Sequence, residues 1–281
     1  MISSRLFVWF QYLLPQHALS RLVLRATRVR TPWLKNALIR GFFKLYAIDM
    51  SDAAQADPLR YGSFNEFFTR SLKPDARVIA ADPHAIACPV DGTVSEAGQI
   101  DGDRLLQAKG RYYSLTELLA ARAWAKDFDG GCFATLYLAP YNYHRVHMPL
   151  RGRLHETVFV PGRLFSVNAA TASLVPRLFA RNERVVTLFD TAFGQVALIM
   201  VGALNVGSIA TVWAGDITPA AKRSVTTLPS SDVALDKGAE LGRFNMGSTV
   251  ILLFQRDRAS WNADLTAGAR IKLGQSLGRL K

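Results

Sequence analysis

Near its C-terminus the chain reads Gly242-Arg243-Phe244-Asn245-Met246-Gly247-Ser248-Thr249-Val250-Ile251-Leu252-Leu253-Phe254. The apolar run from Thr249 to Phe254, with β-branched and aromatic side chains, predicts a buried strand. Gly247 and Ser248 stand at the entrance of that strand. A serine hydroxyl held against the carbonyl group of a flexible glycine can attack its own backbone. Gly247-Ser248 is therefore a candidate site of self-cleavage.

Similar short runs continue through most of the chain and set the expected fold. From about residue 78 they alternate with Gly, Pro and Asp turns, and they predict strands at 132–138, 184–189, 195–201 and 208–213. One helix is expected at 115–125, and a short helix at 64–68 with Ser63 as its cap. This pattern is typical of the α+β class. We expect N-terminal amphipathic helices followed by a largely antiparallel β core.

The first 48 residues differ from the rest in charge. They hold no Asp or Glu but eight of the cations behind the net charge of +12. These are Arg5, Arg21, Arg25, Arg28, Arg30, Lys35, Arg40 and Lys44. Apolar residues at 19, 22, 23 and 26 predict one amphipathic helix, and Thr31 as N-cap with Pro32 predicts the start of a second. Basic, aromatic helices without acids are typical of a membrane surface. An ordinary helical layer that shows its arginines to water is the alternative.

The sequence shows no clear targeting segment, and its two cysteines indicate no specific site. No apolar run is long enough to span a bilayer, and the run at 6–14 is interpreted as a retained interfacial segment rather than a signal peptide. Cys88 and Cys132 have no CxxC spacing, which argues against a disulfide framework or a zinc site.

Two histidines lie in the run Tyr143-His144-Arg145-Val146-His147-Met148-Pro149. The flanking prolines argue against a helix, and in an extended backbone residues three apart point to opposite faces. His144 and His147 would then have different surroundings and different roles. No acidic residue stands nearby in the sequence, so no metal site is expected. Two structural histidines bonded to backbone groups are an equally good interpretation.

Asp91, in Cys88-Pro89-Val90-Asp91-Gly92, becomes interesting beside these histidines. By itself an Asp before a Gly is usually a turn residue. Asp91, His147 and Ser248 are nevertheless the parts of an activated nucleophile, which is recognised by geometry and not by chain order. Two further runs, 109–114 and 161–168, are candidate loops for a phosphate and a lipid chain, or simply surface turns.

Taken together, these runs resemble the phosphatidylserine decarboxylases of the bacterial, membrane-associated type. The resemblance covers most of the chain and rests on several short motifs in order. They are Phe64-Asn65-Glu66-Phe67-Phe68-Thr69-Arg70, Pro89-Val90-Asp91-Gly92, Lys109-Gly110, the histidine run, Pro161-Gly162, Asn182-Glu183-Arg184 and Gly247-Ser248-Thr249. Met246 stands where the family often has Leu, a volume-conserving difference.

The resemblance implies a self-processing enzyme that converts phosphatidylserine to phosphatidylethanolamine and CO2. Cleavage between Gly247 and Ser248 would give a large chain 1–247 and a small chain 248–281 that stay associated. Asp91 would orient His147, and His147 would deprotonate Ser248. Ser248 would end as a pyruvoyl cofactor that forms a Schiff base with the substrate, while His144 would donate a proton during decarboxylation.

The same resemblance implies an organisation and a location. Residues 1–48 would be the membrane-association segment and 49–281 the pyruvoyl-dependent decarboxylase domain. The expected partners are phosphatidylserine and an anionic membrane surface, which places the protein at the periphery of the cytoplasmic face of the bacterial cell membrane. Dimers occur in the family, although no interface can be read from the sequence.

Two other functions stay open from the residues alone. A serine hydrolase could use Ser248, His147 and Asp91, but the chain lacks the G-x-S-x-G elbow at Ser248. A basic membrane-binding module without catalysis would explain residues 1–48 and leave the histidines and Gly247-Ser248 without a role. No nucleic-acid partner is expected, because no recognised nucleic-acid motif is present.

Overall fold

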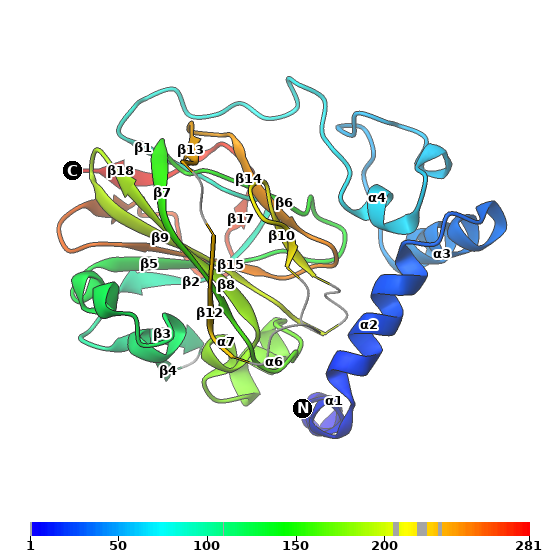
Figure 1. Cartoon of the computed structure of the whole chain (residues 1–281), viewed down its shortest axis with the longest axis horizontal. Coiled ribbons are helices and arrows are strands. Elements are labelled where there is room, and N and C mark those ends of the chain that lie inside the picture. Colours follow the sequence, from blue (N-terminus) through cyan, green and yellow to red (C-terminus); the bar gives the residue numbers. More distant parts are fainter. Residues whose placement is uncertain (1, 109, 205–207, 218–223, 230–231) are drawn as a thin grey trace.

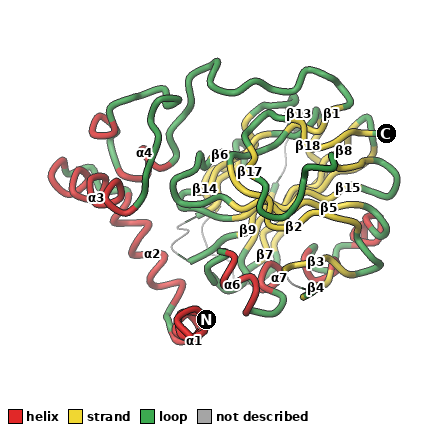
Figure 2. The backbone as a smooth tube through the Cα atoms, turned by 180° about the vertical axis from the view of Figure 1, so that it is seen from behind, coloured by secondary structure: helices red, strands yellow, loops and turns green. Residues whose placement is uncertain are grey.

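The computed structural model describes residues 2–108, 110–204, 208–217, 224–229 and 232–281. It consists of a β core with a helical layer along one side (Figure 1). The C-terminus lies on the side of the core away from the layer, and helix α1 forms the end of the layer that holds the N-terminus. Seen from behind, the strands gather in one body, with most of the helical residues of the chain's start standing apart from it (Figure 2).

The helical elements are short apart from the first three. They are α1 (Ile2–Leu13), α2 (Gln16–Thr27), α3 (Pro32–Leu45), α4 (Phe64–Phe68), α5 (Leu115–Leu118), α6 (Ala169–Leu174) and α7 (Leu178–Arg181), with 3-10 turns η1 (Pro58–Arg60) and η2 (Ala123–Phe128). None of these described helices has the length and apolar character needed to cross a membrane.

The strands pair antiparallel in several sheets. They are β1 (Ala85–Ala87), β2 (Gly92–Gln99), β3 (Arg104–Ala108), β4 (Arg111–Ser114), β5 (Cys132–Tyr137), β6 (Arg145–His147), β7 (Gly152–Val160), β8 (Arg184–Thr191), β9 (Gly194–Val201), β10 (Ile209–Thr211), β11 (Gly215–Ile217), β12 (Thr226–Leu228), β13 (Ala234–Leu235), β14 (Glu240–Phe244), β15 (Thr249–Phe254), β16 (Ala259–Trp261), β17 (Arg270–Ile271) and β18 (Ser276–Leu280).

Strand β15 lies inside the largest sheet, whose order is β12-β7-β8-β9-β15-β5-β2-β17 with β13 also on β7. It pairs with β5 on one side and β9 on the other, from Thr249 opposite Tyr137 and Val201 to Phe254 opposite Cys132 and Val196. All six of its residues are buried. A strand paired along both edges and buried on both faces explains the unbroken apolar run in the sequence.

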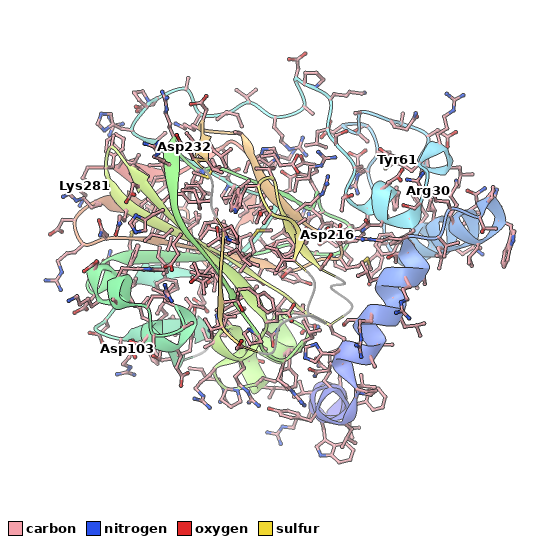
Figure 3. The ribbon with its side chains drawn as sticks, viewed as in Figure 1. Arg30, Tyr61, Asp103, Asp216, Asp232 and Lys281 are labelled. Atoms are coloured by element: carbon pink, nitrogen blue, oxygen red, sulfur yellow. The ribbon has the colours of Figure 1, made fainter. Side chains whose placement is uncertain are left out.

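The helical layer has a small core of its own around Ile39, Phe64, Phe67 and Phe68. Two ion pairs connect α2 and the segment after it to other elements: Arg28 with Asp216 of β11, and Arg30 with Glu66 of α4. Figure 3 shows Asp216 on the side of the β core that faces α2, and Arg30 close to α4. The layer is thus attached to the core near the end of β14.

Several large apolar side chains of α1, α2 and α3 lie on the surface. They are Leu6, Phe7, Trp9, Phe10, Tyr12, Leu13, Leu22, Trp33 and Leu45. The exposed fraction reaches 73 % for Trp33 and 77 % for Leu45. Six of these nine side chains belong to α1 alone, and contiguous apolar surface marks sites of interaction.

Most of the predicted elements are confirmed, and the expected α+β architecture is correct. The predicted strands at 132–138, 184–189, 195–201, 208–213 and 249–254 are all present, with small shifts at their ends. Ser63 does cap α4, since its hydroxyl accepts a hydrogen bond from Glu66 N at 3.1 Å. Thr31 occupies the N-cap position of α3 but makes no side-chain cap bond.

The single helix predicted at 115–125 was wrong. Helix α5 ends at Leu118, and a separate 3-10 turn begins at Ala123. Between them Ala120 and Ala121 both have a φ of 54°, in the left-handed region. Such a conformation ends a right-handed helix, although alanine is the best helix former by propensity.

Candidate active site

The Gly247–Ser248 peptide lies where the chain passes from one sheet into another. Strand β14 belongs to the sheet β11-β10-β14-β6, and β15 belongs to the largest sheet. Ser248 O accepts a hydrogen bond from Leu138 N at 2.8 Å, which holds the serine at the start of β15. The Ser248 side chain is fully buried, and its Oγ has no hydrogen-bond partner among the described residues. An unpaired buried hydroxyl is costly in free energy, so this one requires an explanation.

The imidazole of His144 lies against Gly247. Strands β6 and β14 pair with Arg145 opposite Arg243, and Phe244 N donates to His144 O at 3.0 Å. A Cβ added at Gly247 would lie 3.0 Å from Cε1 of His144, closer than side chains normally approach. Glycine at 247 therefore allows the imidazole to reach the peptide. The other face of the ring stacks on Phe68 of α4, with ring centroids 4.0 Å apart.

The environment of His144 keeps its ring neutral. Its Nε2 lies 3.2 Å from Pro140 O, so we assign the proton to Nε2, because a carbonyl oxygen can only accept. Its buried Nδ1 has no partner among the described residues. Burial lowers the pKa of His144 to about 3. At neutral pH this leaves an unprotonated nitrogen beside the Gly247–Ser248 peptide.

His147 lies at the far end of the same short strand, opposite Glu240. Its Nδ1 is 2.8 Å from Gly238 O, and its Nε2 is 3.0 Å from the hydroxyl of Tyr143. The carbonyl fixes the proton on Nδ1, so the Tyr143 hydroxyl donates to Nε2. Burial lowers the pKa of His147 as well. The two histidines thus have different surroundings, and both rings of the pair are neutral at neutral pH.

Asp91 is held by a cation that sequence reasoning missed. Arg77 donates to its carboxylate through Nε at 3.0 Å and Nη2 at 2.5 Å, and Leu273 N donates at 2.8 Å. Arg77 also pairs with Asp52 at 2.7 Å. Within the described part of the chain no hydrogen bond joins Asp91 to His147. Arg77 belongs to none of the motifs, although it stands only 14 residues before Asp91, so the sequence gives no signal for this contact.

A cavity of about 270 Å³ opens beside the peptide, and we call it the cleavage-site cavity. Phe68, Leu138 and Gly247 line it, together with Ser166 and Val167 from the candidate loop 161–168. None of the described residues of the other candidate loop lines this cavity. Lys109 lies outside the described residues, and 111–114 form strand β4, which pairs with β3.

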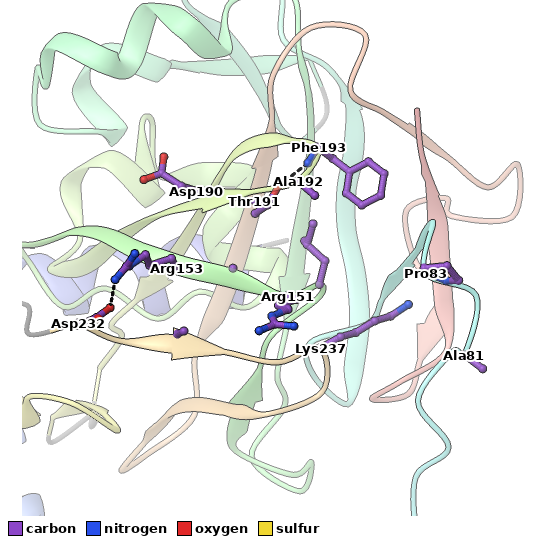
Figure 4. A pocket seen from close by; sticks show the side chains of 13 residues that line it. Ala81, Pro83, Arg151, Arg153, Asp190, Thr191, Ala192, Phe193, Asp232 and Lys237 are labelled. Carbon is purple, nitrogen blue, oxygen red and sulfur yellow. Dashed lines mark hydrogen bonds and ion pairs between the residues drawn. The ribbon is translucent and has the colours of Figure 1, made fainter.

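A larger cavity, of about 870 Å³, lies elsewhere on the core (Figure 4). Asp190, Thr191 and Phe193 of the β8–β9 turn line it, and this turn is at the opposite end of β15 from Ser248, roughly 17 Å away for a strand of this length. The charged side chains there are largely paired, as Arg153 is with Asp232. Volume alone therefore does not identify the reactive site. Among the described residues no group of three His, Cys, Asp or Glu is suited to hold a metal.

Comparison with known proteins connects this geometry to a family. A family model described as "Phosphatidylserine decarboxylase" matches residues 64–279, and a second, described as "PSD", matches residues 6–47. The phosphatidylserine decarboxylase proenzyme of Methylococcus capsulatus is 52% identical over 280 residues, which cover 99% of this chain and 97% of that protein. The proenzyme of Ectopseudomonas mendocina is 52% identical over 282 residues, 99% of each chain. That of Bordetella bronchiseptica is 52% identical over 281 residues, 98% of this chain and 94% of the relative.

Proposed function

This chain belongs to the phosphatidylserine decarboxylase family and is the proenzyme of a carboxy-lyase of phospholipid biosynthesis; we propose that it cuts itself between Gly247 and Ser248. The reaction of the mature enzyme converts phosphatidylserine to phosphatidylethanolamine and CO2. The observation that carries the proposed cleavage is the buried, unpaired hydroxyl of Ser248, directly after a glycine that a neutral imidazole contacts.

In the proposed cleavage, Ser248 Oγ loses its proton to a base and attacks the carbonyl carbon of Gly247. The peptide bond becomes an ester, and the proton moves to the freed nitrogen. A base then removes the Cα proton of residue 248 while the ester oxygen leaves Cβ, which releases chain 1–247 with a terminal carboxylate and leaves a dehydroalanine at 248. Addition of water and loss of ammonia convert that residue to a pyruvoyl group. The buried setting suits these steps, since Ser248 Oγ has no competing hydrogen bond among the described residues.

The surroundings of Ser248 fit a pyruvoyl group. This group supplies an electron sink for the carbanion left when the carboxylate departs. It would form at the residue directly before β15, a strand whose position is fixed by β5 and β9. The cleavage-site cavity lies beside it, and the buried ring of His144 can hold or give a proton there. Fixed neighbours of this kind favour reaction because little reorganisation is needed.

For the histidines we propose the division of labour expected from the sequence. His147 is the base for cleavage, which Asp91 would orient after its carboxylate leaves Arg77. His144 is the proton donor in decarboxylation, once its neutral ring has taken up a proton. In the described arrangement Asp91 bonds to Arg77, and Tyr143 caps Nε2 of His147. For His147 to act as the base, the Tyr143 hydroxyl must therefore either relay the proton to Nε2 or give up its hydrogen bond to that atom. His144 already contacts Gly247, which supports its action at the reacting atoms.

We propose that the helical layer binds the cytoplasmic face of the membrane, which makes the protein peripheral. The exposed side chains of Trp9 and Trp33 and the cations of residues 1–48 support this, since amphipathic basic helices bind anionic lipid surfaces.

Substitution of the nucleophile tests the proposed function. We expect Ser248→Ala to remain one chain of full mass and to release no CO2 from phosphatidylserine, because without Oγ neither the ester nor the pyruvoyl group can form. Thr135→Val is the matched control, as it also removes a buried, unpaired hydroxyl but from the neighbouring strand β5. Two chains from purified Ser248→Ala, or normal ethanolamine-lipid formation by it, would contradict the proposal.

Substitution of each histidine tests the division of labour. We expect His147→Ala to stay uncut, and His144→Ala to be cut but to lose about a hundredfold or more in decarboxylation, in line with general acid–base catalysis. Intact mass follows the cutting, and released CO2 follows the decarboxylation. An uncut His144→Ala beside a cut His147→Ala would instead assign the base to His144.

A further inference from the structure

The Gly247–Ser248 peptide lies in the short connection from β14 to β15, residues 245–248. At the end of this connection Ser248 O accepts a hydrogen bond from Leu138 N at 2.8 Å. Before it, the backbone groups of Met246 and Gly247 make no hydrogen bond with another described backbone group. The direction of the Gly247 carbonyl is therefore set by the parts of the connection that are held on either side. On the side toward β14 the held residue is Asn245.

Both polar atoms of the buried Asn245 side chain are hydrogen-bonded. Its amide nitrogen donates to Ser208 Oγ and, at 3.0 Å, to Asp216 Oδ1. A carboxylate only accepts, so this contact decides which of the two amide atoms is the nitrogen. The amide oxygen then accepts from Asn65 Nδ2 at 3.3 Å, and the same nitrogen donates to Asn245 O at 3.0 Å. Asn245 N also donates to Ser208 O at 3.0 Å, so backbone and side chain are held together.

These contacts join the connection to the helical layer as well as to the core. Asp216 belongs to β11 of the core, and its second carboxylate oxygen pairs with Arg28, which directly follows α2. Asn65 belongs to α4, and Met246 packs against the small core of the layer. A chain of polar contacts thus runs from Arg28 through Asp216 to Asn245, two residues before Gly247.

We propose that Asn245 is a positioning residue for self-cleavage, and that Arg28 of the helical layer acts on it through Asp216. This inference rests on the proposed cleavage. Ser248 Oγ must meet the carbonyl carbon of Gly247 in one orientation, and no other described backbone group holds that carbonyl. A fixed Asn245 restricts the orientation from two residues away, which favours reaction by placing the reacting atoms in advance. Asn245 acts through the backbone that it holds.

Time courses of cutting test this role. Each variant is made by brief cell-free translation in neutral detergent, and intact mass then follows the fraction of uncut chain. We expect Asn245→Ala to be cut more slowly than the parent by about tenfold or more, since small errors of placement reduce rates strongly. Once it is fully cut, its release of CO2 from phosphatidylserine per pyruvoyl group should resemble that of the parent, because the peptide bond that Asn245 orients no longer exists.

Gln107→Ala is the matched control for the loss of a buried amide. The Gln107 side chain of β3 makes three hydrogen bonds, as that of Asn245 does, and its partners are Ala172 O, Val175 O and Leu178 N. Its loss should lower the melting temperature and leave the rate of cutting as in the parent. Equal slowing in both variants would overturn the positioning role, and so would a loss in Asn245→Ala that is as large for decarboxylation as for cutting.

Variants of Asp216, whose side chain is partly exposed, carry the test even if Asn245→Ala fails to fold. Asp216→Ala removes the contacts with both Asn245 and Arg28 and should slow cutting, whereas Asp216→Asn keeps an oxygen that accepts from Asn245 and should recover most of the rate. Arg28→Ala should slow cutting by about threefold, as expected for an exposed ion pair. It should have no further effect when Asp216 is already Ala, because it acts through that residue.

Two results would overturn the connection from the layer to the cleavage site. One is an Asp216→Ala variant that is cut as fast as the parent. The other is an effect of Arg28→Ala that persists without Asp216. A parent that remains one uncut chain throughout would instead contradict the proposed function.

Discussion

The β core buries its apolar side chains, whereas the helical layer leaves many of its own exposed. All residues of β15 are buried between β9 and β5, whereas α1, α2 and α3 leave many of theirs on the surface. The ion pair of Arg28 with Asp216 holds the layer to the core, together with hydrogen bonds from Leu164 N to Gln16 and from Ser166 N to Gln11. The core takes only Val8 from the layer's first helix into its main apolar cluster, whereas the layer leaves apolar surface that another phase can cover. The candidate active site lies where the two regions meet, with Phe68 from the layer stacked on His144 from the core.

The largest expected effect is on stability and comes from the core. Leu252 lies in the middle of β15 and is fully buried, so Leu252→Ala should lower the free energy of unfolding by about 3 kcal/mol. Leu22→Ala in the layer, where the side chain is 64 % exposed, should change it by less than about 0.5 kcal/mol. Denaturant titration of both variants in a Ser248→Ala background measures the difference in a single uncut chain. Equal losses would contradict the contrast between the regions.

A second effect depends on pH. Glu183 is buried in the core, and burial raises its pKa from 4.5 to about 8. Between these values the folded chain keeps a proton that the unfolded chain releases, so stability falls as pH rises through this window. The free energy of unfolding of Glu183→Gln should equal that of the parent near pH 4. Above pH 8 it should be higher than that of the parent by a few kcal/mol at most, since each pKa unit is worth about 1.4 kcal/mol.

Thermal unfolding of the parent and Glu183→Gln across this range measures that effect. Glu156→Gln offers a contrast. Glu156 is paired with Arg122, so this substitution should lower the stability of the protein at neutral pH. Parallel pH profiles for the parent and Glu183→Gln would show that Glu183 is not protonated in the folded chain.

The smallest expected effect belongs to the layer and is on membrane binding. Trp33→Ser removes a 73 % exposed aromatic ring and should weaken binding to vesicles of anionic lipid by about tenfold, since a buried aromatic side chain contributes 1.5–3 kcal/mol or so in apolar surroundings. Tyr112→Ser, at a 44 % exposed ring on β4 of the core, should bind as the parent does. Co-sedimentation with vesicles measures the binding of both variants. An equal loss of binding in both would contradict a specific role of the layer in membrane binding.

The sequence predicted those features that depend on neighbouring residues. The run 249–254 and the Ser63 cap were correct because periodicity and local hydrogen bonds decide them. The helix at 115–125 failed because the left-handed pair Ala120 and Ala121 has no local signal. In the candidate site, the sequence predicted roles for His144 and Ser248, and the structure places the ring of His144 beside Gly247. It missed Arg77, only 14 residues before Asp91, because no periodicity or motif assigns a loop arginine to a particular carboxylate.

The position of β15 inside the sheet also bears on the order of folding and chain cleavage. A strand paired along both edges cannot be added to a finished sheet without first separating its neighbours β9 and β5. If the two pieces were supplied as separate polypeptides, residues 248–281 would have to bind residues 1–247 before the sheet closes. That binding would compete with collapse of the larger piece. One continuous chain avoids that competition, so the proposed cut between Gly247 and Ser248 would have to follow the folding of β15 into the sheet.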